Sequence, residues 1–386
     1  IGAQASWAAA YARAFGFSHD VLRASTLPFS IACAAIAYGL FRRLDVGPRW
    51  SLFATLAIVA SPLFTPWSAS FMTDVQGLTL WLGVLHGTVS LTRARSARQT
   101  FWAATTVGLF GLVGGSIRQV PLALAGVLLG IEFVRRTLLA RRDAGAGRGR
   151  AILVAWGATL FVAAVALSAW TARQPYSVAE GWPDHRRLIA GASAMLALSL
   201  ELALYLLPLS LALIAGVRRR EWLALLAILI VCAAVTAAIG GGSRWSSLAR
   251  APFVGGTMSP TGLTVAGLDA PGDRPIVFPL ALRVGLAAIS IWTIVLAAGR
   301  IDWRRLPAAA RSVDPALGAF ALVAAFYWVM IYPRATHGWT FDRYLLVVLP
   351  IVIVLALRAA APRGGPSAVG WVALLSFAVA GVRGRK

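Results

Sequence analysis

The chain has very few of the residues that build disulfides and zinc sites. Only two of its 386 residues are cysteines, Cys33 and Cys232. Both lie inside apolar runs, where a thiol behaves as a small apolar side chain. The four histidines are widely spaced and form no zinc-ligand pattern. The sequence therefore predicts neither a disulfide framework nor a zinc site built from these residues.

Acidic residues are also scarce. There are 14 of them against 36 basic residues, of which Lys386 is the only lysine, and the net charge is +22. In nucleic-acid-binding proteins such an excess gathers on one face. Here the arginines lie in short connections between apolar runs, so no nucleic-acid partner is expected. The preference for arginine over lysine fits a GC-rich bacterial genome.

Apolar residues fill the rest of the chain. They make up 59% of it, and the mean hydropathy of +0.76 lies beyond that of ordinary soluble domains. We expect an all-α polytopic transmembrane helical bundle of about 11–12 spans with outer-face loops, because a span needs roughly 20 apolar residues. The predicted spans are 27–41, 50–64, 76–91, 102–117, 120–134, 151–170, 190–216, 222–239, 277–298, 315–332, 344–359 and 367–382.

The arginines fix a topology for these spans. One set of alternate connections carries 21 arginines and the other set carries 12 over a greater total length. Short cytoplasmic loops accumulate basic residues, so the richer set is predicted to lie inside. The expected location is the bacterial cytoplasmic membrane, where cationic inner loops favour anionic membrane lipids.

The organisation of the chain is simple. Residues 1–386 are expected to form one transmembrane domain, with no internal repeat at a fixed period. Because the chain begins at Ile1 rather than at a methionine, we expect an upstream helix and a first outer loop before it.

Asp74 is the first candidate site residue. It closes an outer loop without basic residues and stands at the mouth of the third predicted span. A carboxylate there suits a divalent cation, a sugar hydroxyl or general-base catalysis. The alternative is that Thr73 or Asp74 opens a helix, where an anion is favourable in itself.

Arg118 and Gln119 lie between two apolar runs, and the glycines Gly114 and Gly115 come shortly before them. A guanidinium binds phosphate in a bidentate manner, so the pair is predicted to hold the phosphate of a lipid-linked donor. The alternative is an arginine that extends to the membrane surface.

A second phosphate candidate lies in the last outer loop. Arg343 stands between Asp342 and Tyr344 at the start of a predicted span. An interfacial aromatic belt explains the tyrosine but not the neighbouring charges. Arg343 is therefore predicted to bind donor phosphate and Asp342 to bind substrate.

Other polar residues of the outer loops are predicted to contact substrate. These are Arg334, His337, Asp184 and His185. The histidines suit a metal or a proton relay, and the simpler alternative is loop histidines bonded to water. Glu201 is a lone carboxylate inside a span, where ionisable groups are functional candidates or are protonated and bonded to a neighbouring helix.

The order of these features resembles a known family. An outer segment FGFSHDVLR (15–23), a basic turn FRRLDVGPRW (41–50) and the segment SPLFTPWSASFMTD (61–74) follow one another. They are followed by SIRQ (116–119) and FDRYLLVVLPIV (341–352). This pattern is similar to GT-C-type integral-membrane glycosyltransferases, the bacterial group that includes protein O-mannosyltransferases and aminoarabinose transferases.

The resemblance implies a polyprenyl-phosphate sugar as donor and a lipid, glycan or protein acceptor on the non-cytoplasmic face. It places Asp74 in a catalytic role and Arg118 and Arg343 near the donor phosphate. The family carries its usual catalytic carboxylate in the first outer loop. Residues 1–26 offer only Asp20, which does not match that pattern.

We therefore expect a membrane glycosyltransferase, with a divalent cation (Mg or Mn) as a possible cofactor and unknown metal ligands. One rival interpretation is a transporter or flippase of a lipid-linked or amphipathic solute, which the missing internal repeat weakens. The other is a non-catalytic membrane protein of envelope assembly.

Overall fold

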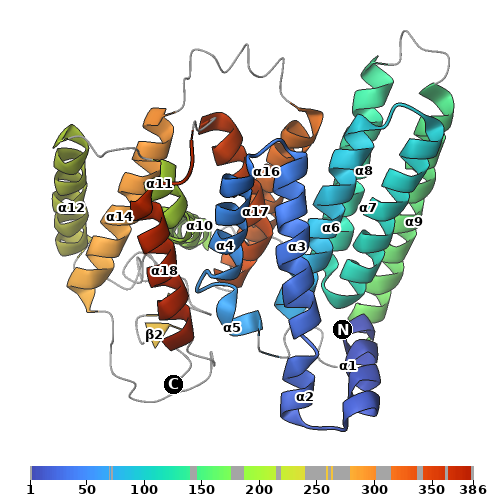
Figure 1. Ribbon diagram of the computed structural model, residues 1–386, viewed down its shortest axis with the longest axis horizontal. Coiled ribbons are helices and arrows are strands. Elements are labelled where there is room, and N and C mark those ends of the chain that lie inside the picture. The colour runs from blue at the N-terminus through green and yellow to red at the C-terminus, as the bar shows by residue number, and fades with distance from the viewer. Residues whose placement is uncertain are drawn as a thin grey trace. The chain divides into compact units, whose positions relative to one another are not determined.

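A computed structural model describes most of the chain (Figure 1). The described residues are 2–68, 70, 73–139, 146–174, 187–213, 219–239, 258–259, 262–263, 279–300, 314–336, 342–360 and 364–383. Helices account for nearly all of them. The described strands are β1 (Met258–Ser259) and β2 (Gly262–Leu263), which pair antiparallel. The predicted all-α fold class is confirmed.

Every predicted apolar run contains a helix. These helices are α3 (Leu27–Arg43), α4 (Pro48–Val59), α6 (Thr73–Arg93), α7 (Ala97–Ile117), α8 (Gln119–Leu139), α9 (Ala146–Ala172), α10 (Leu188–Tyr205) with α11 (Leu207–Leu213), α12 (Arg219–Ile239), α14 (Leu280–Arg300), α16 (Pro315–Thr336), α17 (Leu345–Ala360) and α18 (Ala368–Arg383). The shorter elements are α1 (Gly2–Phe15), α2 (His19–Ala24), α5 (Thr65–Ser68) and the 3₁₀ helix η4 (Asp342–Tyr344).

Several of these helices are suited to cross a membrane. By length and composition, four described segments qualify: His19–Arg43, which joins α2 and α3, and segments of α7, α9 and α16. The pair α10–α11, bent by 52°, is a fifth candidate, and shorter apolar stretches lie in α12, α14, α17 and α18. The protein is thus a multi-pass membrane protein. The larger predicted number of spans stays a prediction.

The chain divides into two compact units. The first unit comprises 1–45, 67–179 and 309–327, and the second comprises 46–66, 180–308 and 328–386. The prediction of a single domain is not decided by this division and stays a prediction.

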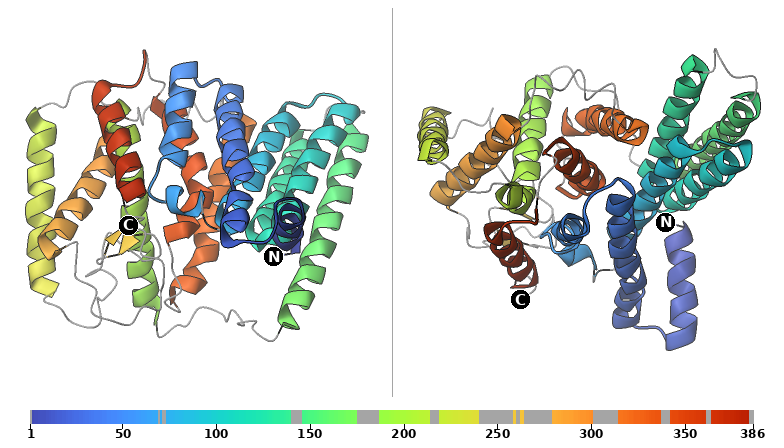
Figure 2. Two further views of the ribbon diagram at one scale, coloured as in Figure 1. Left: turned by 60° about the horizontal axis from the view of Figure 1, so that its bottom comes forward. Right: turned by 45° about the horizontal axis from the view of Figure 1, so that its top comes forward.

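The first unit is built around α6, α7, α8 and α9, which lie side by side (Figure 2). Glycines let them approach closely. A Cβ placed on Gly108 of α7 would lie 2.1 Å from the Trp156 ring of α9, and one on Gly83 of α6 would lie 2.5 Å from the Phe110 ring of α7. Membrane helices pack through such small residues because lipid offers no hydrophobic drive for association.

The second unit packs through aromatic side chains. Trp222 of α12 and Trp292 of α14 stack with their ring centroids 5.7 Å apart, and the Trp292 indole donates a hydrogen bond to the Glu221 carbonyl at 2.9 Å. Phe53 of α4 meets Trp371 of α18 edge to face at 4.9 Å. Such aromatic pairs are typically worth about 0.5–1.5 kcal/mol beyond the area they bury.

In the first unit, helix ends that the predicted topology places on one side of the membrane lie close together. Arg43, at the end of α3, donates a hydrogen bond to the Ser90 hydroxyl near the end of α6. Arg93, the last residue of α6, pairs with Asp314 directly before α16 at 2.7 Å. The C-terminal ends of α3 and α6 and the N-terminal end of α16 therefore share one end of the unit.

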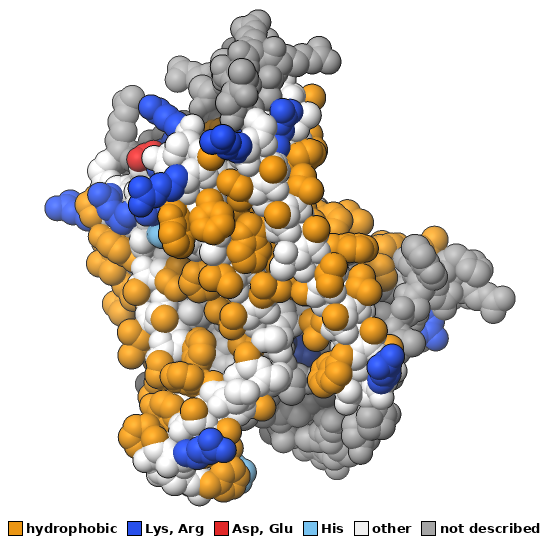
Figure 3. All heavy atoms as spheres, turned by 90° about the vertical axis from the view of Figure 1, so that its right-hand side faces the viewer, with side chains coloured by type: hydrophobic (Ala, Val, Ile, Leu, Met, Phe, Trp, Pro, Cys, Tyr) orange, Lys and Arg blue, Asp and Glu red, His pale blue; other side chains and the backbone are white. Residues whose placement is uncertain are grey.

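The arginines are unequally divided between the two ends of this unit. The end just described, named here the arginine-rich end, carries nine described arginines: Arg42, Arg43, Arg93, Arg95, Arg98, Arg135, Arg136, Arg148 and Arg150. The opposite, arginine-poor end carries four: Arg13, Arg23, Arg118 and Arg173. On the face shown in Figure 3, basic side chains gather mainly at the upper end, above a broad hydrophobic band. The arginine-rich end is the one predicted to face the cytoplasm.

Candidate functional site

The arginine-poor end of the first unit holds a buried ion pair between two of the predicted site residues. The Arg118 Nη2 atom lies 2.8 Å from the Asp74 Oδ1 atom, and the Arg118 Nε atom donates a hydrogen bond to the Thr73 hydroxyl at 3.1 Å. Helix α6 begins at Thr73, so Asp74 occupies its first turn. The expectation that these residues open a helix is confirmed, and the same carboxylate also binds Arg118.

Local sequence explains why Arg118 reaches across to α6. Helix α7 ends at Ile117, and Arg118 caps it in an extended conformation (φ −140°, ψ 134°). The turn into α8 is tight because a Cβ on Gly114 would lie 2.7 Å from Pro121. On α6, a Cβ on Gly77 would meet the Arg118 Cδ at 3.3 Å, so this glycine leaves room for the arginine stem.

The two members of the pair differ in exposure. The Asp74 side chain is fully buried, whereas the Arg118 side chain is 22% exposed. Neither Asp74 oxygen accepts a well-aligned hydrogen bond within the described part of the chain, so the contact is an ion pair rather than a hydrogen bond. A general base must reach the proton it removes. In this structure Asp74 is placed to orient Arg118, and Arg118 is the member that a ligand can contact.

Gln76, two residues further along α6, was missed by the sequence analysis. Its side chain is fully buried, and neither amide atom has a hydrogen-bond partner among the described residues. A buried polar group without a partner typically costs about 1–3 kcal/mol. The available signal was an amide within an apolar run, close to Thr73 and Asp74.

Gln119 has a different neighbour from Arg118. It is exposed at the start of α8, and its amide nitrogen lies 3.5 Å from the hydroxyl of Thr171 near the end of α9. This distance is at the limit of a hydrogen bond. The two adjacent residues thus share the arginine-poor end but contact different helices.

In the second unit, the structure brings together two segments that the sequence analysis selected. The Arg334 guanidinium, in the last turn of α16, lies 5.5 Å from the centre of the Tyr344 ring. This is a cation–π geometry. Arg343 is half-buried in η4, directly before α17. The predicted binding of donor phosphate by Arg343 stays a prediction.

Four other predicted site residues lie wholly or partly outside the described residues. His337, Asp184 and His185 lie outside the described residues, as does the side chain of Asp342, whose backbone begins η4. Their predicted substrate contacts therefore stay predictions.

A divalent cation does not fit the geometry around Asp74. The described residues contain no group of three or more histidine, cysteine or acidic side chains that could hold a metal ion. The place beside the Asp74 carboxylate is taken by the Arg118 guanidinium. A cation at the same oxygen would be repelled by that charge, and the divalent cation expected from the sequence stays a prediction.

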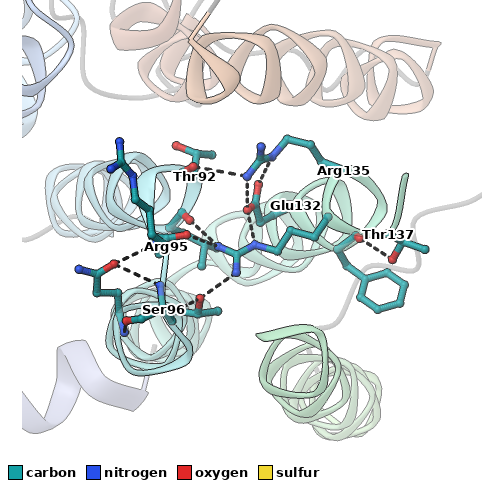
Figure 4. Close-up of polar contacts among 12 residues, drawn as sticks. Thr92, Arg95, Ser96, Glu132, Arg135 and Thr137 are labelled. Atoms are coloured by element: carbon teal, nitrogen blue, oxygen red, sulfur yellow. Dashed lines mark hydrogen bonds and ion pairs between the residues drawn. The ribbon is translucent and has the colours of Figure 1, made fainter. Parts of the chain in front are cut away.

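The arginine-rich end holds a second buried carboxylate, Glu132 of α8 (Figure 4). It is 2% exposed, and each of its oxygens is bound by a guanidinium. Arg135 donates to both oxygens at 2.7 Å, and Arg136 donates to one of them at 2.6 Å. Charge-assisted bonds of this kind are the stronger hydrogen bonds in proteins.

The two arginines extend this cluster to neighbouring helices. Arg136 donates to the Thr100 hydroxyl of α7 at 2.8 Å and to the Leu91 carbonyl of α6 at 2.9 Å, and Arg135 donates to the Thr92 carbonyl at 3.4 Å. Carbonyls in the last turn of a helix have no partner within it. The cluster therefore caps α6 and ties it to α7 and α8. The spacing of Glu132 three and four residues before the arginines was the signal in the sequence.

Comparison with known proteins adds no relative. No family model, no curated protein and no solved structure matches the chain. The structural features that bear on function are therefore the helical fold, the Asp74–Arg118 pair and the cluster of Glu132 with Arg135 and Arg136.

Proposed function

We propose that the protein is a membrane glycosyltransferase of GT-C type that takes a sugar from a polyprenyl-phosphate donor at the arginine-poor end of the first unit. The observation that carries the proposal is the position of Arg118. It is a partly exposed guanidinium, held by a buried carboxylate, at the end of apolar helices and opposite to the arginine-rich end. A lipid carrier would present its phosphate at such an end of membrane-spanning helices.

Arg118 is suited to bind that phosphate. It stays positively charged at any physiological pH, and its guanidinium carries five N–H donors in a planar fork. The Nε group is directed to Thr73 and Nη2 faces Asp74, so donors remain for a ligand. The leaving phosphate develops negative charge during transfer, and a preorganised cation stabilises this charge.

Asp74 acts as a positioning residue in this proposal. Its burial and its ion pair fix the direction of the Arg118 side chain and lower the rotational freedom that binding would otherwise remove. As a general base it would have to separate from Arg118 and reach the acceptor hydroxyl. The burial of its carboxylate favours the positioning role.

The proposal extends to the acceptor, which is a lipid, glycan or protein on the non-cytoplasmic side.

The test uses the purified full-length chain in lipid nanodiscs with a labelled polyprenyl-phosphate hexose. We expect Arg118→Gln to weaken donor binding by tenfold or more and to abolish transfer. Arg173→Gln, an exposed arginine at the same end of the unit, should change neither and is the matched control. Full donor binding by Arg118→Gln, or transfer from a soluble nucleotide sugar without a lipid carrier, would contradict the proposal.

One feature favours a transporter or flippase as the second candidate. The pair α10–α11 bends by 52°, and Glu201, close to the bend, is fully buried with the Tyr205 hydroxyl 3.4 Å from its Oε1 atom. Broken helices with ionisable groups line the binding sites of many transporters. Movement of the labelled donor between the leaflets of liposomes, without any covalent product, would favour this function over transfer.

A further inference from the structure

The arginine-rich end of the first unit has far more positive than negative charge. It carries nine described arginines against three described acidic residues, Asp45, Glu132 and Asp314. A charge excess of this size attracts anions from one side of the protein. The question is which arginines are available to bind them.

The three acidic residues are already used inside the unit. Glu132 holds Arg135 and Arg136, and Arg93 lies 2.7 Å from Asp314 and 3.6 Å from Asp45. These three arginines are therefore structural, because their charges are balanced within the protein.

Of the other exposed arginines at this end, Arg42 and Arg43 lie in the last turn of α3, where Arg43 donates to the Ser90 hydroxyl. The remaining three exposed arginines are Arg95, Arg98 and Arg148. Within the described part of the chain, none of them belongs to an ion pair. Arg98 lies in the first turn of α7 and Arg148 in the first turn of α9. These two turns are neighbours, because a Cβ on Gly149 would lie 3.8 Å from the Thr100 hydroxyl.

Aromatic side chains lie one turn further along α7. Phe101 is 45% and Trp102 is 60% exposed, and their rings are 5.3 Å apart. Trp102 follows Arg98 by four residues, so the two share a face of the helix. Tryptophan is enriched where headgroups meet acyl chains. The surface thus has cations at the ends of the helices and exposed aromatic rings one turn further along α7.

We propose that Arg95, Arg98 and Arg148 bind the phosphate headgroups of anionic phospholipids, with Phe101 and Trp102 against the adjoining acyl chains. Charge complementarity identifies the headgroup as anionic, and the exposed rings identify the partner as a lipid rather than a soluble phosphate compound. This site lies at the opposite end of the unit from Arg118, so it does not depend on the proposed transferase activity.

The test compares the lipids that the purified full-length chain retains from mixed micelles of phosphatidylglycerol and phosphatidylcholine, counted by native mass spectrometry. We expect the unaltered protein to be enriched in phosphatidylglycerol. The triple variant Arg95→Gln, Arg98→Gln, Arg148→Gln should show an enrichment at least threefold smaller than that of the unaltered protein. Its melting temperature in phosphatidylcholine alone should stay unchanged, because none of the three belongs to an ion pair in the described chain.

The matched control removes the same number of exposed arginines from the arginine-poor end: Arg13→Gln, Arg23→Gln and Arg173→Gln. It should keep the enrichment. An unchanged enrichment in the first triple variant, or an equal loss in the control, would overturn the proposal. If the first triple variant does not fold, Arg98→Gln and Arg148→Gln are each compared with Arg173→Gln, under the same criterion.

Discussion

Replacing Glu132 by glutamine tests the cluster at the arginine-rich end. The substitution keeps the shape of the side chain but leaves two guanidinium groups without their common carboxylate. Removing one partner of a fully buried ion pair typically costs about 3–5 kcal/mol. Arg135 and Arg136 are 29% and 16% exposed, so water compensates part of this loss. We therefore expect a destabilisation of about 2–3 kcal/mol.

The assay is equilibrium unfolding of the purified protein in mixed micelles, with a thermal melt as a second measurement. Asp20→Asn is the control, because it removes one carboxylate from the exposed pair with Arg23, which spans 3.7 Å. Exposed pairs are worth about 0–1 kcal/mol, so this variant should be nearly neutral. If Glu132→Gln were no less stable than Asp20→Asn, the reasoning about the cluster would be refuted.

Three further predictions follow from single positions. Gly108→Ala should lower stability by about 1–3 kcal/mol through overpacking. Gly126→Ala is the control and should not lower stability, because nothing lies within 4 Å of the added carbon. Thermal melts of the two variants test this difference. Gln76→Met should raise stability, because it removes a buried amide that has no hydrogen-bond partner among the described residues; a lower melting temperature than that of the unaltered protein would contradict this. For topology, a cysteine at position 68 should react with an impermeant reagent added outside, whereas one at position 96 should not; the reverse result would invert the orientation.

The helices were predictable from the sequence because apolar length and charge act locally. A run such as 151–170 lies within a helix, α9, whatever its neighbours are. The meeting of helix ends was predictable in the same way, since short connections force α6, α7 and α8 to alternate in direction. The start of α6 at Thr73 also follows from residues close in sequence.

The contacts between helices were not predictable in this way. Whether Asp74 faces Arg118 depends on how α6 and α7 are rotated about their axes and on the room that Gly77 leaves for the arginine stem. The same holds for the burial of Gln76 and for the reach of Arg136 to the carbonyls of α6. Sequence reasoning selected Asp74 and Arg118 separately, but only the structure pairs them.

The most direct test of the proposed function is a double-mutant cycle on that pair, with the affinity for the labelled polyprenyl-phosphate donor as the measured quantity. If Asp74 acts through Arg118, then Asp74→Asn and Arg118→Gln should each weaken binding, and the double variant should bind no more weakly than Arg118→Gln alone. Additive losses, or full donor affinity in Arg118→Gln, would contradict the account.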